Sequence, residues 1–311
     1  MLENSWQGLI YKDRNLPKVY DARNSFQSHR YLTETAEIFW MNCLCQTSNL
    51  KSDLVKDNPL DNLSSHIVRP LKYMNSTCMV SLGPGNSYLD SILISTLQEF
   101  SSLRKYIPVD INYNFAMNAA NNLHKLIDIP FLVCVDFEQD WHYLKSILLE
   151  KINDSILFSI LGGTLGNLDI GEYNFIENIA SISNEILLSI TVKSNYWSIK
   201  DEPRLCHDKY NIDHIKFILN EVGLAETCTA NLLQNFKNRV SLLSTDGCIP
   251  GSTRIVGYDN YSGNQLLKIT RYNQAKFISW ILENFNLQLI DSNKLRWSEY
   301  LENYVVLLRK N

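Results

Sequence analysis

The chain has 311 residues, of which 45% are hydrophobic and 20% are charged, so it can bury a full core and is not composed like a disordered protein. Its formal net charge is −4 and it has no long run of lysine or arginine, which argues against a broad nucleic-acid-binding surface. No apolar run approaches about 18 residues, and the first residues lack the basic and apolar regions of a signal peptide. We therefore expect a cytoplasmic protein that binds neither membrane nor nucleic acid.

The seven cysteines and six histidines do not have the spacing of a metal site. The sequence has no CxxC, HxH or HxxxH pair, and the close pair Cys43 and Cys45 has no second pair to complete a ligand set. An odd, scattered set of cysteines is typical of reduced thiols in a cytosolic protein. We therefore predict no metal centre.

Five apolar runs in the middle of the chain alternate with spans that fit helices. Each run has the length of a buried strand, and the alternation predicts right-handed crossovers and a parallel sheet. The expected strands are 79–82, 106–110, 131–135, 156–161 and 185–192, and the expected helices are 86–103, 113–127, 139–151 and 171–183.

The two ends of the chain and one later stretch have different patterns. Residues 1–75 are predicted to be mixed helix and loop. Turn residues separate three short strand-like runs after residue 238, which predicts an antiparallel meander, and the last residues fit a helix and a hairpin. The predicted elements are helices near 211–222 and 230–236, strands at 239–244, 253–258 and 265–271, a helix from 275 to 285, and hairpin strands at 287–290 and 304–308.

The central strands end in residues that suit a nucleoside ligand. Gly83 and Gly85 follow the first strand, where glycine lets the chain turn sharply and lets backbone amides approach a ligand. Asp110 closes the second strand, where a carboxylate can accept both hydroxyl groups of a ribose. Each of these features is also compatible with an ordinary turn or helix cap.

Asp136 and Phe137, at the end of the third strand, distinguish two cofactors. An acid followed by an aromatic ring suits the amino group and the ring of adenine, and NAD enzymes have no such requirement there. The dinucleotide-binding fingerprint is also incomplete, because its third glycine is missing after Gly85. The order of these residues therefore favours S-adenosyl-L-methionine (SAM), with S-adenosyl-L-homocysteine as product, and a class I methyltransferase.

In this order the motifs resemble the histidine-specific methyltransferase family, whose known member trimethylates the α-amine of histidine in ergothioneine synthesis. The resemblance spans nearly the whole chain. The segments that resemble family motifs are 16–23 (PKxFYDxxGS), 31–33 (YPTR), 82–85 (ELGxG), 106–110 (YxPVD), 136–138 (GDFE) and 162–167 (GSTIGN).

The resemblance implies an α/β fold, in which a Rossmann-like methyltransferase sheet carries an antiparallel carboxy-terminal hairpin. The methyltransferase domain would comprise 76–193 and 271–311, and a smaller α+β substrate domain would comprise 1–75 and the insertion 194–270. The resemblance assigns the cofactor to Tyr31, Gly83, Gly85, Asp110, Asp136, Phe137 and Gly162.

The same resemblance assigns catalysis and substrate binding to Tyr20 and Asn167. A tyrosine hydroxyl and an asparagine amide can orient an amine and a carboxylate without adding charge. Tyr20 could instead be a buried packing residue, and Asn167 a turn or helix-cap residue.

The chain departs from the family in three places. Ser81 stands where the family has a glutamate, and Leu89 stands where it has a lysine that binds the cofactor carboxylate. On a late strand, the family member that takes histidine has an E-x-S pair whose acid holds the imidazole. The third departure is that the corresponding strand of this chain has no acid at that position in either possible alignment.

In one alignment the late-strand pair is Leu267 and Ile269, and in the other it is Lys268 and Thr270. Strand alternation lets only one pair face the pocket. The first pair suits an apolar or aromatic amino acid and the second suits a substrate with an extra carboxylate, although Lys268 could also be a solvent-facing charge. An imidazole without a partner would lose roughly 1–3 kcal/mol, so we expect that free histidine is not the substrate.

We predict a SAM-dependent N-methyltransferase that acts on the α-amine of an amino acid or amino-acid-like metabolite, with Lys268 and Thr270 as further substrate-binding residues and a monomer as the default state. One alternative is a tailoring enzyme for a peptide or biosynthetic intermediate, because the segment between Tyr20 and Tyr31 is shorter than in the family. Another alternative is a non-catalytic partner subunit. Ser81 and Leu89 favour this alternative, whereas Asp110, Asp136 and Asn167 argue against it.

Overall fold

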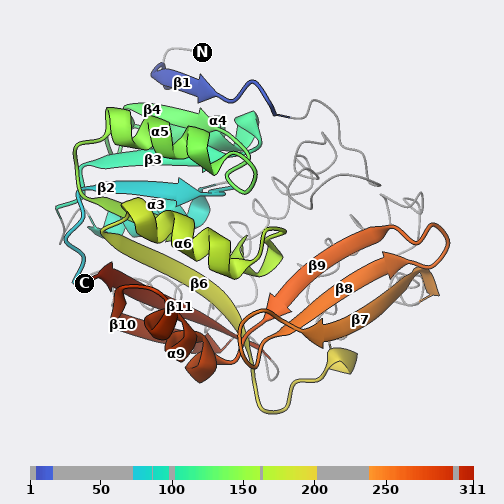
Figure 1. The fold of residues 1–311 in the computed structure, drawn as a ribbon. Helices are drawn as coiled ribbons and strands as arrows, with labels where there is room; N and C mark the ends of the chain where they lie inside the picture. The colour runs from blue at the N-terminus through green and yellow to red at the C-terminus, as the bar shows by residue number, and fades with distance from the viewer. Residues whose placement is uncertain are drawn as a thin grey trace, which may run out of the picture.

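The computed structural model shows a large sheet covered by helices and a small separate sheet (Figure 1). The structure describes residues 5–16, 73–85, 87–97, 102–161, 164–201, 238–296 and 301–311. The large sheet has eight strands in the order β1-β4-β3-β2-β5-β6-β11-β10. These strands are β1 (Leu9–Lys12), β2 (Cys78–Leu82), β3 (Lys105–Asp110), β4 (Phe131–Cys134), β5 (Ile156–Ile160), β6 (Glu185–Lys193), β10 (Leu287–Arg296) and β11 (Leu301–Lys310).

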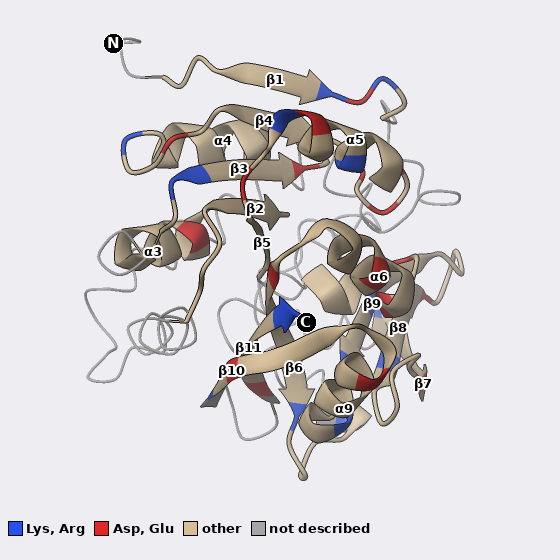
Figure 2. Cartoon of the chain, turned by 60° about the vertical axis from the view of Figure 1, so that its left-hand side comes forward, with Lys and Arg blue, Asp and Glu red and all other residues tan. Residues whose placement is uncertain are grey.

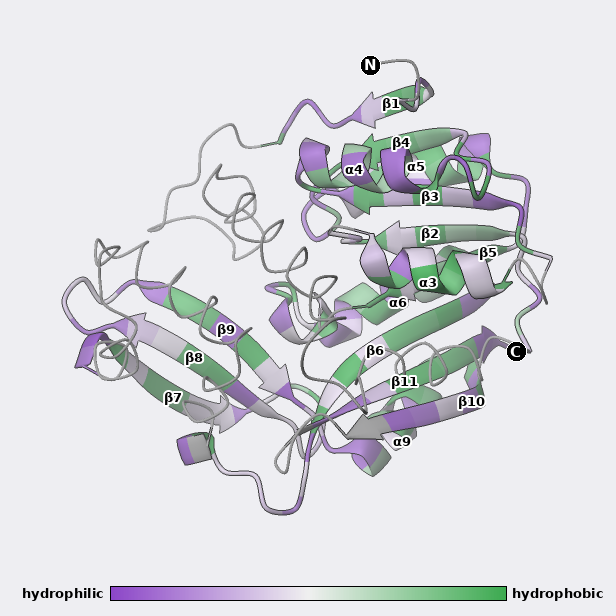
Figure 3. Cartoon of the chain, turned by 180° about the vertical axis from the view of Figure 1, so that it is seen from behind, coloured by the Kyte–Doolittle hydropathy of each residue, from purple (hydrophilic) through white to green (hydrophobic). Residues whose placement is uncertain are grey.

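The strands from β1 to β6 pair in parallel, and β11 and β10 close the sheet with antiparallel pairings. Strands β2, β4 and β5 are buried at every residue, as expected for parallel strands covered on both faces. Figure 3 shows these strands as mostly hydrophobic bands. The predicted α/β fold with a Rossmann-like class I methyltransferase sheet and an antiparallel carboxy-terminal hairpin is therefore confirmed.

Helices cover both faces of this sheet. One core cluster packs α5, α6 and α9 on one face, and a second packs α3 and α4 on the other. The side chains of Asn112 and Asn273 cap the first turns of α4 and α9 by accepting backbone N–H groups. The helices are α3 (Tyr88–Leu97), α4 (Tyr113–Leu123), α5 (Trp141–Lys151), α6 (Glu172–Ile182) and α9 (Gln274–Asn284), with short 3₁₀ helices at Thr164–Asn167 and Ile199–Asp201.

The small sheet has three antiparallel strands, β7 (Val240–Asp246), β8 (Thr253–Asp259) and β9 (Gln265–Arg271), which confirms the predicted meander. It lies on the side of the molecule toward which the parallel strands point (Figure 1). Arg254 of β8 forms an ion pair with the buried Glu172 of α6 at 3.2 Å, and the Tyr272 hydroxyl donates to the same carboxylate at 3.0 Å. These contacts fix the small sheet against the carboxyl ends of the parallel strands.

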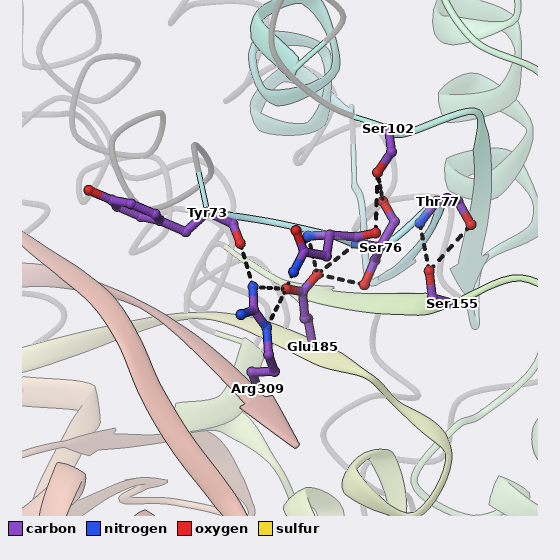
Figure 4. Close-up of polar contacts among 8 residues, drawn as sticks. Tyr73, Ser76, Thr77, Ser102, Ser155, Glu185 and Arg309 are labelled. Carbon is purple, nitrogen blue, oxygen red and sulfur yellow. Dashed lines mark hydrogen bonds and ion pairs between the residues drawn. The ribbon is translucent and has the colours of Figure 1, made fainter. Parts of the chain in front are cut away.

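The opposite edge of the large sheet, where the parallel strands begin, is held by one buried carboxylate (Figure 4). Glu185, at the start of β6, accepts the backbone N–H groups of Asn75 and Ser76 and the Ser76 hydroxyl at 2.6 Å. Arg309 of β11 donates to the same carboxylate from Nη2 at 2.7 Å and also donates to the Tyr73 carbonyl. Glu185 therefore ties the segment before β2 to β6 and β11.

Some predictions in the described residues were wrong in detail; for example, α4 ends at Leu123 rather than at residue 127. Residues 9–12 form a strand rather than helix or loop, because the edge of β4 offers its free backbone groups to them, and Tyr11 packs edge-on against Phe131. Residues 102 and 103 are not helical, because the backbone here already turns into β3 and the Arg104 N–H donates to the Thr77 carbonyl at 2.8 Å. The helices expected near 211–222 and 230–236 lie outside the described residues.

Candidate active site

The loop after β2 has the backbone that a cofactor loop requires. Gly83 and Gly85 have φ angles of 70° and 54°, a left-handed conformation that favours glycine. A Cβ added at Gly83 would lie 3.4 Å from Oγ1 of Thr164, so the loops after β2 and β5 approach each other closely. The Gly83 N–H donates to the Val109 carbonyl at 2.8 Å and the Gly85 N–H donates to the Asp110 carboxylate, so the two glycines turn the chain sharply over the end of β3.

Asp110, the last residue of β3, lies beside this loop and is 5% exposed. Its Oδ1 accepts the Asn112 N–H at 2.9 Å. Burial raises the pKa of Asp110 to about 7, although hydrogen bonds from the backbone of Asn112, Gly85 and Ile111 act in the opposite direction. The carboxylate thus gains from any further donor, and the two hydroxyl groups of a ribose supply such donors.

Asp136 and Phe137 follow β4 and are both largely buried. Oδ1 of Asp136 accepts the backbone N–H groups of Glu138 and Gln139 at 3.0 and 3.3 Å, so this oxygen caps the turn that leads into α5. The Phe137 ring packs against Phe175 of α6 with a centroid distance of 5.8 Å and belongs to the core. Both residues therefore have structural contacts in addition to the cofactor role that the resemblance implies.

The turn after β5 carries Asn167 toward the small sheet. A Cβ added at Gly166 would lie 3.1 Å from the backbone oxygen of Thr270, so this turn approaches the backbone of β9 more closely than a larger residue would readily allow. Asn167 is half-buried, and within the described parts of the chain its side-chain amide has no hydrogen bond. The fold therefore brings Asn167 and Thr270, which are far apart in sequence, to the same place.

The Lys268 side chain of β9 reaches this turn and strand alternation puts Thr270 on the same face, whereas Leu267 lies over Gly257 of β8. Lys268 Nζ pairs with Asp169 Oδ1 at 2.5 Å, and the two side chains are 10% and 11% exposed. Thr270 Oγ1 is buried and makes no well-formed hydrogen bond within the described residues. Sequence reasoning missed Asp169, because its contact with Lys268 spans 99 positions of the chain.

Glu138 is a second residue that sequence reasoning missed, although it belongs to the 136–138 motif. Its Oε2 accepts the backbone N–H groups of Asp169 and Ile170 at 2.6 and 3.1 Å. Burial raises the pKa of Glu138 to about 7, and the nearby Asp169 and Asp136 carboxylates contribute, while the two backbone hydrogen bonds lower it. The motif alone could have suggested a role for Glu138, but not the loop that it holds.

The structure also accounts for the departures at 81 and 89. Ser81 donates to Asp90 Oδ2 at 2.7 Å, and the Tyr106 hydroxyl donates to the same oxygen at 2.6 Å, so a carboxylate from α3 is held beneath the glycine loop. Leu89 packs against the core cluster on that face. The position of the family's lysine is therefore a packing position here.

Of the predicted site residues, the structure brings Gly83, Gly85, Asp110, Asn167, Lys268 and Thr270 together around the carboxyl ends of β2, β3 and β5, with Asp136 and Phe137 at one side. Tyr20, Tyr31 and Gly162 lie outside the described residues. The buried acids and positive-φ glycines fit a ribose-bearing ligand such as SAM. Figure 2 shows that β3 ends in an acidic position and that basic residues are spread over many elements.

Among the described residues, no helix is long and apolar enough to span a membrane. The same residues contain no group of three or more histidine, cysteine or acidic side chains arranged to hold a metal ion.

Several solved methyltransferase structures are similar in fold at low sequence identity. The small RNA methyltransferase HEN1 is 11% identical with a TM-score of 0.43, over 83% of this chain and only 26% of the longer HEN1 chain. Magnesium protoporphyrin IX methyltransferase from Synechocystis PCC 6803 is 10% identical with a TM-score of 0.44, over 91% and 97% of the two chains. The CurJ carbon methyltransferase is 10% identical with a TM-score of 0.46, over 90% and 62%. These likenesses do not indicate the acceptor.

No curated protein matches the sequence. The model of one protein family, described as histidine-specific, SAM-dependent methyltransferase, matches residues 60–214. This range holds the glycine loop, Asp110, the 136–138 motif and the Asn167 turn. The chain belongs to this family and is a SAM-dependent methyltransferase.

Proposed function

We propose that this enzyme methylates the α-amine of an amino acid or an amino-acid-like metabolite, and that free histidine is not its preferred acceptor. The observation that carries the proposal is the position of Asn167, whose half-buried amide has no hydrogen bond within the described residues and lies beside β9. An asparagine amide offers both donors and an acceptor, so it can orient the amine and carboxylate of an amino acid. Tyr20 would complete this site.

The cofactor would lie over the carboxyl ends of β2, β3 and β4. In this proposal the backbone of Gly83 and Gly85 faces its amino-acid part, Asp110 accepts the ribose hydroxyl groups, and Asp136 and Phe137 contact the adenine. Tyr31 and Gly162 are assigned to the same ligand by family resemblance.

The methyl transfer requires little acid–base catalysis by the protein. When bound, SAM supplies a methyl group that its sulfonium already activates for transfer. The residues of the chain then have to hold a neutral amine in line with that methyl group at near-attack distance. Asn167 and Tyr20 are suited to this task because neither brings a charge that would favour the unreactive ammonium form.

The contact between Lys268 and Asp169 bears on the acceptor side chain. The positive charge of Lys268 is already balanced at 2.5 Å, so the pair gives no electrostatic preference for an acidic acceptor over a neutral one. An imidazole would have to compete with the lysine ammonium for the Asp169 carboxylate. We therefore favour an acceptor with a neutral side chain, bound beside Lys268 and Thr270.

The amino-terminal segment 1–75 and the insertion 194–270 would together form the acceptor domain. The small sheet supports this division, because it connects to the methyltransferase sheet through Glu172 and through the turn that carries Asn167. We also propose that the acceptor is a small molecule rather than a nucleic acid and that the enzyme is cytoplasmic and monomeric.

The first experiment is to incubate the purified protein with SAM and a panel of free amino acids, histidine included, and to identify products by mass spectrometry. We expect methylation of one amino acid with a neutral side chain. Preferred methylation of histidine would contradict the specificity proposal, and failure on every amino acid would point to a peptide or biosynthetic intermediate.

Substitution of Asn167 by alanine tests the site itself. We expect turnover to fall by at least about tenfold, since a buried hydrogen bond to a charged group contributes about 1.5–3 kcal/mol, while calorimetry shows unchanged binding of S-adenosylhomocysteine. Asn174→Ala, on the exposed face of α6, is the matched control. Full activity of Asn167→Ala would refute the assigned acceptor site.

A further inference from the structure

Glu138 joins two loops whose parent strands are not neighbours. It follows β4, whereas the turn that it binds follows β5, and the sheet order places β3 and β2 between them. Neighbouring strands are about 4.8 Å apart, so the link between Glu138 and this turn passes across the ends of two strands. Those two strands carry Asp110 and the glycine loop, the proposed cofactor residues.

The contacts of Glu138 continue on both sides. Its own backbone N–H donates to Asp136 Oδ1 at 3.0 Å, and its carboxylate accepts the N–H groups of Asp169 and Ile170. Asp169 in turn pairs with Lys268 of the small sheet. A continuous series of hydrogen bonds therefore runs from the proposed adenine side of the site to the proposed acceptor side.

The burial and charge of Glu138 fit a role beyond local packing. Its side chain is 8% exposed, and within the described residues no lysine or arginine forms an ion pair with it. A buried carboxylate without a cation is costly, and here two backbone N–H groups of a single turn compensate part of this cost. Those hydrogen bonds form only when the turn has its present conformation.

We propose that Glu138 is a positioning residue that holds the turn of Asn167 and Asp169 in place for the acceptor and couples it to the occupied cofactor site. This inference rests on the proposed function for its account of the two sides. In this proposal Glu138 does not contact the reacting atoms. Because this coupling is reciprocal, the Glu138→Ala variant is expected to lose the order of the turn and to lose no more affinity for S-adenosylhomocysteine than the factor by which this ligand slows exchange in the turn.

Amide hydrogen exchange tests the proposal without a known acceptor. In Glu138→Ala we expect the Asp169 and Ile170 amides to exchange about tenfold faster or more, since each loses a charge-assisted hydrogen bond. Glu138→Gln keeps an oxygen acceptor and should show a smaller increase. Glu138→Asp is one methylene shorter and should behave like the alanine variant. Glu177→Gln, exposed on α6, is the matched control and should leave this turn unchanged.

A second arm adds S-adenosylhomocysteine, with its affinity measured by calorimetry. In the unsubstituted protein we expect the ligand to slow exchange at Asp169 and Ile170, and in Glu138→Ala we expect it to bind but not to protect these amides. Exchange in β11 reports global unfolding and should be the same in both proteins. If the unsubstituted protein failed to bind this ligand, the proposed cofactor residues would be wrong, whereas the first arm would still test Glu138.

A pH series provides a readout that simple packing would not change. Burial raises the pKa of Glu138 to about 7, with the Asp136 and Asp169 carboxylates facing it and Lys268 balancing Asp169. Protection of the Asp169 and Ile170 amides should therefore weaken as the pH falls through about 7, and it should stay flat in Glu138→Gln. Equal exchange of these amides in Glu138→Ala and the unsubstituted protein would overturn the proposal. So would a loss of affinity for S-adenosylhomocysteine in Glu138→Ala that exceeds the factor by which this ligand slows exchange of the two amides in the unsubstituted protein.

Discussion

Glu185, where the parallel strands begin, and Asp110 and Glu138, where they end, are buried acids with different surroundings, whereas Glu172 at the second edge is paired with Arg254. At the edge where the parallel strands begin, Glu185 is 1% exposed and is surrounded by two backbone amides, a hydroxyl group and the Arg309 guanidinium. At the edge where they end, Asp110 and Glu138 are 5% and 8% exposed. Within the described residues neither forms an ion pair, and burial raises the pKa of each to about 7.

The presence or absence of a cation next to a buried acid indicates whether that acid only holds the fold together or is available to a ligand. A carboxylate with a full set of donors and a cation has its charge compensated within the folded chain, and its removal leaves the cation and the donors uncompensated. A buried carboxylate that lacks a cation destabilises the empty protein, and the loss is compensated when a ligand brings donors. The edge with incompletely compensated acids is thus the one to expect at a ligand site, and it is the edge that carries the family motifs.

The largest expected effect comes from breaking the complete cluster. Glu185→Ala leaves Arg309 without its carboxylate and two backbone amides without an acceptor, so we expect a loss of about 3–5 kcal/mol in the free energy of unfolding. Urea unfolding measures this loss. Glu150→Ala, on the exposed face of α5, is the control and should be nearly neutral. Under native conditions the affinity for S-adenosylhomocysteine should not change. A large drop in this affinity would contradict the assignment of Glu185 to stability alone.

The converse change is Asp110→Asn. We expect the affinity for S-adenosylhomocysteine to fall by about 10-fold to 100-fold, since hydrogen bonds to a charged group contribute about 1.5–3 kcal/mol. At pH 7.5 the free energy of unfolding should be unchanged or higher, because the variant removes a buried charge. Calorimetry and urea unfolding of the same samples give both values. Lower stability with unchanged affinity would assign Asp110 to the structural class.

Asp90, beneath the glycine loop, allows a test by pH. Burial raises its pKa to about 6, against hydrogen bonds from Tyr106 and Ser81 that lower it. A raised folded-state pKa means that its contribution to stability is present below about pH 4 and is lost as the pH rises through about 6. Relative to Asp90→Asn, the unsubstituted protein should therefore lose on the order of 2 kcal/mol between pH 4 and 7. Parallel curves from thermal unfolding across this range would contradict the assignment.

The smallest effect is expected from a solvated pair at the same edge as Glu185. Lys105 and Asp154 lie 2.7 Å apart, but their side chains are 37% and 30% exposed. Solvent screens such a pair, so Lys105→Ala should change the free energy of unfolding by no more than about 1 kcal/mol. Equal losses in Lys105→Ala and Glu185→Ala would show that burial does not decide the contribution of an acid at this edge.

The sequence alone was sufficient for most of the described elements and for the family. Continuous apolar runs require strands buried on both faces, and such strands form a parallel sheet when helices connect them. The residues at the ends of these runs, such as Asp110 and Asn167, then have to lie at one edge, because the carboxyl ends of parallel strands meet there. The first strand, 9–12, escaped prediction because its register is set by the open edge of β4 rather than by its own pattern.

Only the tertiary structure could decide which residues meet across that edge. Strand alternation left two pairs on β9, and the contact of the Lys268 side chain with Asp169 selects the face that carries Lys268 and Thr270. The contact of Glu138 with the N–H groups of Asp169 and Ile170 was equally unpredictable, because it spans two intervening strands. Local patterns specify which face of an element is buried, whereas the partner of a buried charge depends on how distant loops pack, and no periodicity in the sequence records that.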